Sequence, residues 1–190
     1  MKFNDKKIFI GCSSRNFIND KYLLLAKEVA NICILRGYDL VFGASTNGMM
    51  GKCYNLFLEN NQRIYSHTVS KYLDDLKNIN SNSEYIHETT FDRTKGLYQD
   101  ANLILFLPGG TGTIAEIFSI LEENRSIDLP KKVILYNYEG YYNKLLDLIK
   151  YCVENRFNEE IIFDNFKIVN DIDELISELE NKNIDGIKNI

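Results

Sequence analysis

The sequence predicts an α/β domain with a mainly parallel sheet flanked by helices on both faces. Short apolar runs alternate with amphipathic stretches along the chain, and continuous apolar runs are typical of strands buried on both faces of a parallel sheet. No internal repeat and no linker divides the 190 residues, so a single domain over 1–190 is expected. Right-handed crossovers between such strands give a doubly wound, Rossmann-like fold.

The first half of the chain predicts three strands separated by two helices. The apolar run 7–11 is the first strand, and apolar residues at helical spacing over 22–36 end at Gly37, a favourable helix C-terminal residue. The apolar stretch 38–42 predicts a second strand, and the glycines over 43–51 predict a turn into the next helix. The remaining segments are a helix over 50–60, a strand over 63–69 and a polar, Asn-rich segment over 70–83 that we expect to be an exposed, mobile loop with some helix.

The second half repeats the alternation and contains the most apolar strand, 103–107, which runs directly into Pro108. A long amphipathic pattern over 113–124 predicts the helix after it. Aspartates at the start of 171–182 predict the last helix, because carboxylates cap its free N–H groups, and residues 183–190 are expected to be a frayed tail. The other expected elements are an extended segment over 84–90, helices over 93–100 and 141–155, and strands over 132–136 and 166–169.

The composition argues against several classes of partner. Hydrophobic residues make up 45% and charged residues 26% of the chain, which excludes a disordered chain, a coiled coil and a collagen-like repeat. The 22 basic and 27 acidic residues give a net charge of −5, which argues against nucleic-acid binding through a basic surface. No apolar run is long enough for a signal peptide or a membrane span. We therefore expect a cytoplasmic protein that binds neither nucleic acid nor membrane.

The cysteines and histidines predict no metal site. The cysteines form no CxxC pair and no zinc-ligand spacing, so we expect them to be reduced and to act as small core residues. His67 and His87 stand alone in the sequence and are expected to be structural or exposed. Neither a metal nor a cofactor is expected. The four cysteines are Cys12, Cys33, Cys53 and Cys152.

Three segments follow strand ends, where open parallel sheets bind ligands. They are 11–15, 43–51 and 108–116. The third, PGGTGTIAE, gives the strongest signal, because its glycines let the backbone approach an anion and the following helix directs its N–H groups and dipole toward a phosphate. Glu116 lies about one turn into that helix, beside whatever the phosphate anchors. The spacing fits neither a Walker A loop nor the dinucleotide GxGxxG pattern.

Plainer interpretations of the same residues stay open. The glycine-rich segment also fits a tight strand–helix turn, with Glu116 as a favourable N-terminal charge. Arg93 precedes a helix that feeds the same strand, and it fits both a second phosphate anchor and a surface residue. Glu122 and Glu123 continue the helix and are typical of a solvated face, with the rim of the pocket as the alternative.

These segments together resemble the LOG ("Lonely Guy") family, whose hallmark is PGGxGTxxE. Residues 108–116 match that pattern completely, and Arg93 lies fifteen residues before the proline, as the family's arginine does. GCSS at 11–14 resembles the family's GSSS turn, NGMMG at 47–51 its GLMG segment, and EGYYNKLL at 139–146 its DGYYNxLL segment. The resemblance covers residues 7 to about 155.

The resemblance implies a phosphoribohydrolase, which hydrolyses the N-glycosidic bond of a nucleoside 5′-monophosphate, here AMP or N6-modified AMP, to free base and ribose 5-phosphate. Arg93 and Glu116 correspond to the catalytic pair. Glu116 would stabilise positive charge on the ribose and activate water, and Arg93 would orient the substrate or assist departure of the base. Members are typically homodimers, and the helices after both residues would contribute to the dimer face. The implied substrate- and phosphate-binding residues are Ser13, Gly43, Asp75, Gly109, Gly110, Thr111, Gly112 and Thr113.

The sequence departs from the family pattern at three places. Thr94 stands where the family has lysine, with Lys95 one position later and turned by about 100° on the helix. Residues 44–45, Ala and Ser, replace two glycines of a YGGG turn, and two glutamates at 122–123 fall in a Thr-Trp-x-Gln segment. Two alternatives therefore stay open beside the hydrolase: a nucleotide-binding protein or sensor without turnover, and a base-exchanging transferase. A decarboxylase is disfavoured, because no motif places a lysine for a pyridoxal Schiff base.

Overall fold

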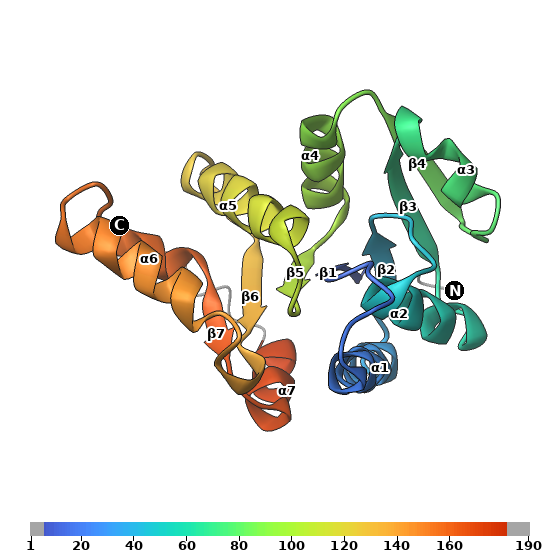
Figure 1. Cartoon of the computed structure of the whole chain (residues 1–190), viewed down its shortest axis with the longest axis horizontal. Helices are drawn as coiled ribbons and strands as arrows, with labels where there is room; N and C mark the ends of the chain where they lie inside the picture. The colour runs from blue at the N-terminus through green and yellow to red at the C-terminus, as the bar shows by residue number, and fades with distance from the viewer. Residues whose placement is uncertain (1–5, 182–190) are drawn as a thin grey trace.

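The computed structural model describes residues 6–181 (Figure 1). The tail expected at 183–190 lies outside these residues. The seven strands are β1 (Lys7–Gly11), β2 (Asp39–Phe42), β3 (Ile64–Val69), β4 (Ser83–His87), β5 (Leu103–Phe106), β6 (Lys132–Tyr136) and β7 (Lys167–Val169). The α-helices are α1 (Asp20–Leu35), α2 (Gly48–Glu59), α3 (Leu73–Leu76), α4 (Thr90–Asp100), α5 (Thr111–Arg125), α6 (Asn143–Glu154) and α7 (Ile172–Glu180). Short 3-10 helices are η1 (Ser70–Tyr72), η2 (Tyr138–Gly140) and η3 (Glu160–Asn165).

All seven strands form one parallel sheet in the order β4-β3-β2-β1-β5-β6-β7. This confirms the doubly wound, Rossmann-like α/β fold, with a sheet that is wholly rather than mainly parallel. The chain leaves β1 toward one edge of the sheet and returns to pair β5 on the other side of β1. The strand order therefore reverses between β1 and β5, which is where such sheets bind ligands.

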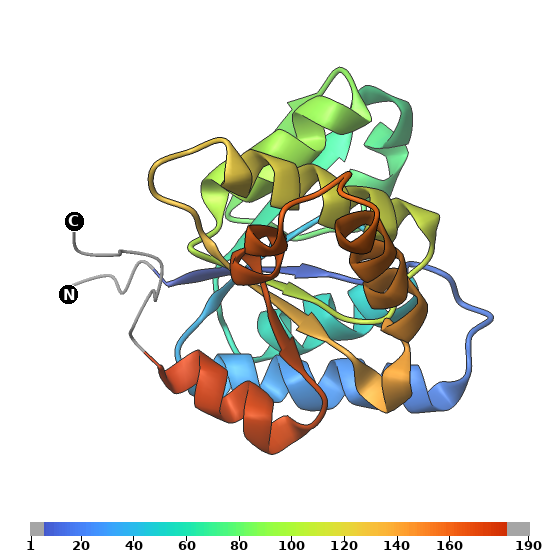
Figure 2. The ribbon, with the colours of Figure 1, turned by 90° about the vertical axis from the view of Figure 1, so that its left-hand side faces the viewer.

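Helices cover both faces of the sheet, and Figure 2 shows the sheet between the two layers. Alternate strand residues face opposite layers because side chains alternate along a strand. Ile8 and Ile10 pack into a first core cluster, which lies under α1, α2 and α7. Phe9 packs into a second core cluster, which lies under α4, α5 and α6. The two apolar faces explain why these strands are continuous hydrophobic runs in the sequence.

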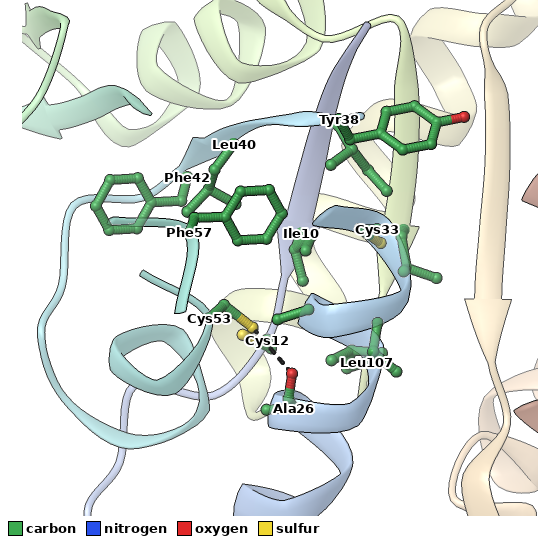
Figure 3. Close-up of a cluster of buried hydrophobic side chains, with 14 of the residues drawn as sticks. Ile10, Cys12, Ala26, Cys33, Tyr38, Leu40, Phe42, Cys53, Phe57 and Leu107 are labelled. Atoms are coloured by element: carbon green, nitrogen blue, oxygen red, sulfur yellow. Dashed lines mark hydrogen bonds between the residues drawn. The ribbon is translucent and has the colours of Figure 1, made fainter. Parts of the chain in front are cut away.

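The cysteines behave as expected, as free core residues. Cys12, Cys33 and Cys53 are buried in the first cluster (Figure 3), and Cys152 is half-buried. The Cys53 thiol donates to the Ala26 carbonyl at 3.6 Å. Burial raises the pKa of the Cys33 thiol, which keeps it protonated. Separately, none of the helices within residues 6–181 combines the length and the apolarity that a bilayer span requires.

Several element boundaries differ from the expected ones. Helix α4 begins at Thr90 rather than at 93, because the Thr89 side chain accepts a hydrogen bond from the Asp92 N–H and caps the helix. Arg93 therefore lies inside the helix. Helix α5 begins at 111 rather than 113. Helix α6 begins at 143 rather than 141, because η2 precedes it, and η3 is an additional short helix that the sequence did not predict.

The segment 70–83 has some helix, as expected, but it is not exposed throughout. It contains η1 and α3, and two of its apolar side chains, Leu76 and Ile79, are 9% and 8% exposed and join the first core cluster. The Asn80 N–H donates to the Tyr54 hydroxyl at 2.7 Å, which ties the segment to α2. Because most residues of this segment are polar, the sequence pattern does not predict that these two apolar side chains are buried.

Candidate active site

A cavity of about 430 Å³ lies at the carboxyl ends of the central strands, where the three glycine-containing segments meet. Of the residues predicted from the sequence, those in the cavity lining are Ser13, Gly43, Arg93, Gly110, Thr111, Gly112, Thr113 and Glu116. The cavity lining also includes Cys12, Ser14, Arg15, Ala44, Ser45 and Met50 from the first two predicted segments, and the lining residues outside all three segments are Thr68, Tyr72 and Thr90. Each of these follows or ends a strand, or opens the next helix, and this position was the one available signal.

Arg93 and Glu116 form a partly buried ion pair in this cavity. The Arg93 Nη2 donates to Glu116 Oε1 at 2.8 Å, and the two side chains are 19% and 12% exposed. Arg93 comes from the first turn of α4 and Glu116 from the second turn of α5, so two helices on one face of the sheet fix the pair. The Arg93 Nε is buried and has no hydrogen-bond partner among the described residues. A second acceptor, such as a substrate oxygen, would satisfy it.

The environment of Glu116 alters its acidity. Burial raises the pKa of Glu116 above its ordinary value, and the charge and hydrogen bond of Arg93 partly oppose this rise. A carboxylate whose pKa is displaced toward neutrality, at the base of a cavity, has the properties of a group that exchanges protons or stabilises a developing positive charge.

The N-terminus of α5 is open to the cavity. Within residues 6–181, the backbone N–H groups of Gly110, Thr111 and Gly112 have no recorded acceptor, and no side chain caps the helix. A Cβ at Gly110 or Gly112 would have no heavy atom within 4 Å, so both glycines face empty space. Free N–H groups at the positive end of a 15-residue helix favour a phosphate or carboxylate. The arrangement can therefore hold an anion beside Glu116.

Gly109 has a different position from the one expected. It does not line the cavity, and a Cβ there would lie 2.2 Å from Thr113 Oγ1. Its carbonyl accepts a hydrogen bond from the Tyr141 hydroxyl at 2.7 Å. Gly109 therefore allows the loop to pass close to the first turn of α5, and it supports the anion site without facing it.

Gly109→Ala should destabilise the fold, whereas Gly110→Ala should not. The added methyl group at 109 forces Thr113 aside, at a cost of about 1–3 kcal/mol in the free energy of unfolding. The methyl group at 110 meets nothing in the protein but occupies anion space. Urea unfolding and calorimetric titration with inorganic phosphate would separate the two effects. Equal unfolding midpoints for the two variants would contradict this assignment of Gly109.

Two hydrogen bonds from backbone N–H groups, one to a side chain and one to a carbonyl, join the first two loops. The Gly48 N–H donates to Asn16 Oδ1 at 2.9 Å, and the Met50 N–H donates to the Ser13 carbonyl at 3.2 Å. Ala44 adopts a φ of 56°, a left-handed conformation that glycine adopts at lower cost. Ala44, which replaces a glycine of the family's YGGG turn, therefore keeps a glycine-like backbone conformation, and its methyl group is buried in the core.

Four of the residues that depart from the family pattern lie outside the cavity. Thr94, Lys95 and Glu123 line a separate groove between α4 and α5, and Glu122 is exposed and pairs with Arg125. Glu122 lies on a solvated face, in agreement with the first of the two interpretations, neither glutamate lines the cavity, and Lys95 does not replace the missing lysine there. Asp75 lies in α3, and its side chain is outside the described part of the structure.

The two histidines, which stand alone in the sequence, lie against each other in the fold. His67 is 2% exposed, and its Nδ1 and Nε2 lie 3.0 Å from His87 Nε2 and 3.3 Å from Asp100 Oδ2. Both ring nitrogens of His67 are therefore within hydrogen-bond distance of a polar partner, one in His87 and one in Asp100. Parallel pairing of β3 with β4 and packing of Gly96 against both rings create this cluster. The cluster lies outside the cavity lining.

Comparison with known proteins gives one family and several relatives. A family described as "Possible lysine decarboxylase" matches residues 49–179. A probable cytokinin riboside 5′-monophosphate phosphoribohydrolase, LOG4 of Oryza sativa subsp. japonica, is 25% identical over 175 residues, which cover 92% of this chain and 76% of the relative. The cytokinin riboside 5′-monophosphate phosphoribohydrolase LOG4 of Arabidopsis thaliana is 26% identical over 156 residues, covering 80% and 71%.

Solved structures share the fold. A Moco carrier protein from Chlamydomonas reinhardtii superposes with a TM-score of 0.66 at 15% identity, covering 92% of this chain and 94% of that protein. A molybdenum cofactor binding protein from Rippkaea orientalis gives a TM-score of 0.64 at 13% identity, with the same coverage. At these identities the likeness concerns the architecture of the sheet and its helices.

Proposed function

Because this chain belongs to the family described as "Possible lysine decarboxylase" and its relatives include LOG phosphoribohydrolases, we propose that it hydrolyses the N-glycosidic bond of a nucleoside 5′-monophosphate. The substrate is AMP or an N6-modified AMP, and the products are the free base and ribose 5-phosphate. The observation that carries the proposal is the Arg93–Glu116 ion pair beside an open helix N-terminus in one cavity. Such a site offers free N–H groups that can bind the phosphate and a carboxylate that can lie beside the ribose.

The family description itself fits the cavity less well. Decarboxylation of lysine through a pyridoxal cofactor needs a lysine that forms a Schiff base. No lysine is present among the described residues that line the cavity. The chemistry of the residues present therefore favours glycosidic cleavage over amine-releasing decarboxylation.

In the proposed reaction, the N–H groups of Gly110, Thr111 and Gly112 bind the 5′-phosphate and fix the ribose. The C1′–N bond breaks with its electron pair leaving on the base, which takes up a proton, and positive charge develops on the ribose. The Glu116 carboxylate stabilises this charge and accepts a proton from the water that adds to C1′. Arg93 keeps Glu116 ionised and oriented, and its buried Nε is available to the substrate.

A turnover panel tests the proposal. The protein would be incubated with AMP, GMP, CMP, UMP and N6-isopentenyl-AMP, and base and ribose 5-phosphate would be measured by chromatography. Release of an adenine-type base, lost in Glu116→Gln, is the expected result. Binding without release from any of the five nucleotides would leave a non-catalytic nucleotide-binding protein. Release that requires an added acceptor base would indicate the transferase.

The four free cysteines are consistent with a reducing, cytoplasmic setting.

We also propose that two chains associate through the face formed by α4 and α5. Phe91 is 79% exposed beside the groove that contains Thr94, Lys95 and Glu123. Phe91→Asp should convert a dimer into a monomer, because it places a charge in the centre of an apolar contact. Light scattering after size exclusion would measure this. Phe157→Asp is the matched control, since Phe157 is 80% exposed after α6. A wild-type monomer at micromolar concentration would contradict the proposal.

A further inference from the structure

The EGYYNKLL segment does not line the cavity, and the proposed reaction gives it no role. It nevertheless makes two hydrogen bonds to residues 107–112, the phosphate loop of the proposed site. The Tyr142 hydroxyl donates to the Leu107 carbonyl at 2.6 Å, and the Tyr141 hydroxyl donates to the Gly109 carbonyl at 2.7 Å. Two consecutive side chains thus hold the carbonyl groups on either side of Pro108.

The local backbone explains how neighbouring tyrosines reach the same loop. Glu139 and Gly140 have φ values of 51° and 72°, so the chain turns sharply before the tyrosines. The Asn137 side chain secures the turn, because its Oδ1 accepts from the Tyr142 N–H at 2.7 Å. Asn137 is 7% exposed, and its Nδ2 donates to Asn143 Oδ1 at 2.9 Å. The tyrosines therefore project from a rigid base.

The hydrogen-bond directions divide the loop into two sides. The carbonyl groups of Leu107 and Gly109 accept from the tyrosines, and the Gly110 carbonyl accepts from the Ile114 N–H at 3.1 Å. The N–H groups of residues 110–112 remain without an acceptor among the described residues. Carbonyl oxygens repel an anion and N–H groups attract it. Holding the carbonyl groups on protein donors therefore leaves an anion in the cavity facing N–H groups.

We propose that Tyr141 and Tyr142 are positioning residues, which orient the peptide groups of the phosphate loop for binding the 5′-phosphate. The inference rests on the proposed function for the identity of the anion. Tyr142 is 1% exposed, whereas Tyr141 is 40% exposed and contacts Tyr22 edge-on with 5.9 Å between ring centroids. Burial raises the pKa of both hydroxyl groups, so both remain protonated donors at neutral pH.

Tyr141→Phe is the decisive variant, because its partly exposed ring can stay in place while only the donor is lost. The dissociation constant for inorganic phosphate, measured by calorimetry, should rise by about fivefold to tenfold, the equivalent of one neutral hydrogen bond. The melting temperature should change little. With AMP as substrate, KM should rise more than kcat, and the preference for AMP over adenosine should fall. A purely structural tyrosine would lower the melting temperature and leave phosphate affinity unchanged.

Tyr22→Phe is the matched control, since Tyr22 belongs to the same aromatic cluster and its hydroxyl has no recorded hydrogen bond within residues 6–181. This variant should bind phosphate as the wild type does. Equal phosphate affinity in Tyr141→Phe and the wild type, or no phosphate binding by the wild type, would overturn the inference. If phosphate affinity falls as expected while no nucleotide is hydrolysed, the proposed function fails and the positioning role stands.

Discussion

Glu116→Gln is expected to lower kcat by about a thousandfold or more and to leave KM within a few-fold of the wild type. Glutamine has the same shape and still accepts a hydrogen bond from Arg93, but it has no negative charge for the ribose and no basic oxygen for the water proton. Base release from the best nucleotide of the panel measures the effect. Glu122→Gln is the control, because this glutamate is exposed on the same helix outside the cavity. If the Glu116→Gln variant retained a tenth of the wild-type activity, Glu116 would not have the proposed catalytic role.

The same substitution has an unusual expected effect on stability. Burial raises the pKa of Glu116 in the folded protein, so the ionised form is disfavoured by folding at neutral pH even with Arg93 beside it. A neutral glutamine removes that penalty, and the melting temperature at pH 7 should equal or exceed that of the wild type. The advantage should disappear as the pH falls below the ordinary pKa of a glutamate, where both states of the wild type are protonated. Active-site groups that reduce stability in this way are retained for their chemistry.

Arg93→Met is expected to lower kcat/KM by about a hundredfold or more and to change the pH profile. The ionised Glu116 loses the cation that opposes the effect of burial, so the pKa of Glu116 should rise further. Because the reaction needs the carboxylate, activity falls as the pH drops through this pKa. The acid limb of the kcat/KM profile should therefore move to higher pH in Arg93→Met.

The controls for Arg93 distinguish charge from shape. Arg93→Lys retains the charge and should return the acid limb toward the wild-type position, with only part of the activity, because an ammonium group cannot reproduce the planar donor set. Arg125→Met removes an arginine that pairs with Glu122 on the exposed side of α5, and it should leave the profile unchanged. An acid limb that stays in place in Arg93→Met would show that Arg93 does not control the ionisation of Glu116.

The fold could be predicted from the sequence because its determinants are local. Continuous apolar runs identify the strands, and the glycine-rich segment after 107 predicts a loop that does line the cavity. Boundaries were less accurate where a side chain that is unremarkable in sequence decides them, as Thr89 does for α4. Buried Leu76 and Ile79 were overlooked because their neighbours are polar.

The parts of the site that escaped prediction depend on contacts between distant segments. His67 and His87 pair only because β3 and β4 run parallel in register. The sequence left a solvated face and the rim of the cavity open for the two glutamates at 122–123, and the rotation of α5 about its axis decides between them by turning both away from the cavity. The hydrogen bond from Tyr141 to Gly109 joins residues 32 positions apart. No local pattern contains that information.

The position of β1 at the centre of the sheet has a consequence for how the chain acquires its structure. β1 pairs with β2 nearby in sequence, but its other edge pairs with β5, so that Ile8 lies opposite Leu103. Contacts of such long sequence separation form slowly, because a large loop must close before they are made. During synthesis on a ribosome, nearly a hundred further residues are added after β1 before β5, its second neighbour in the sheet, emerges. Until then an apolar strand edge is exposed, so newly made chains are most vulnerable to self-association in that interval.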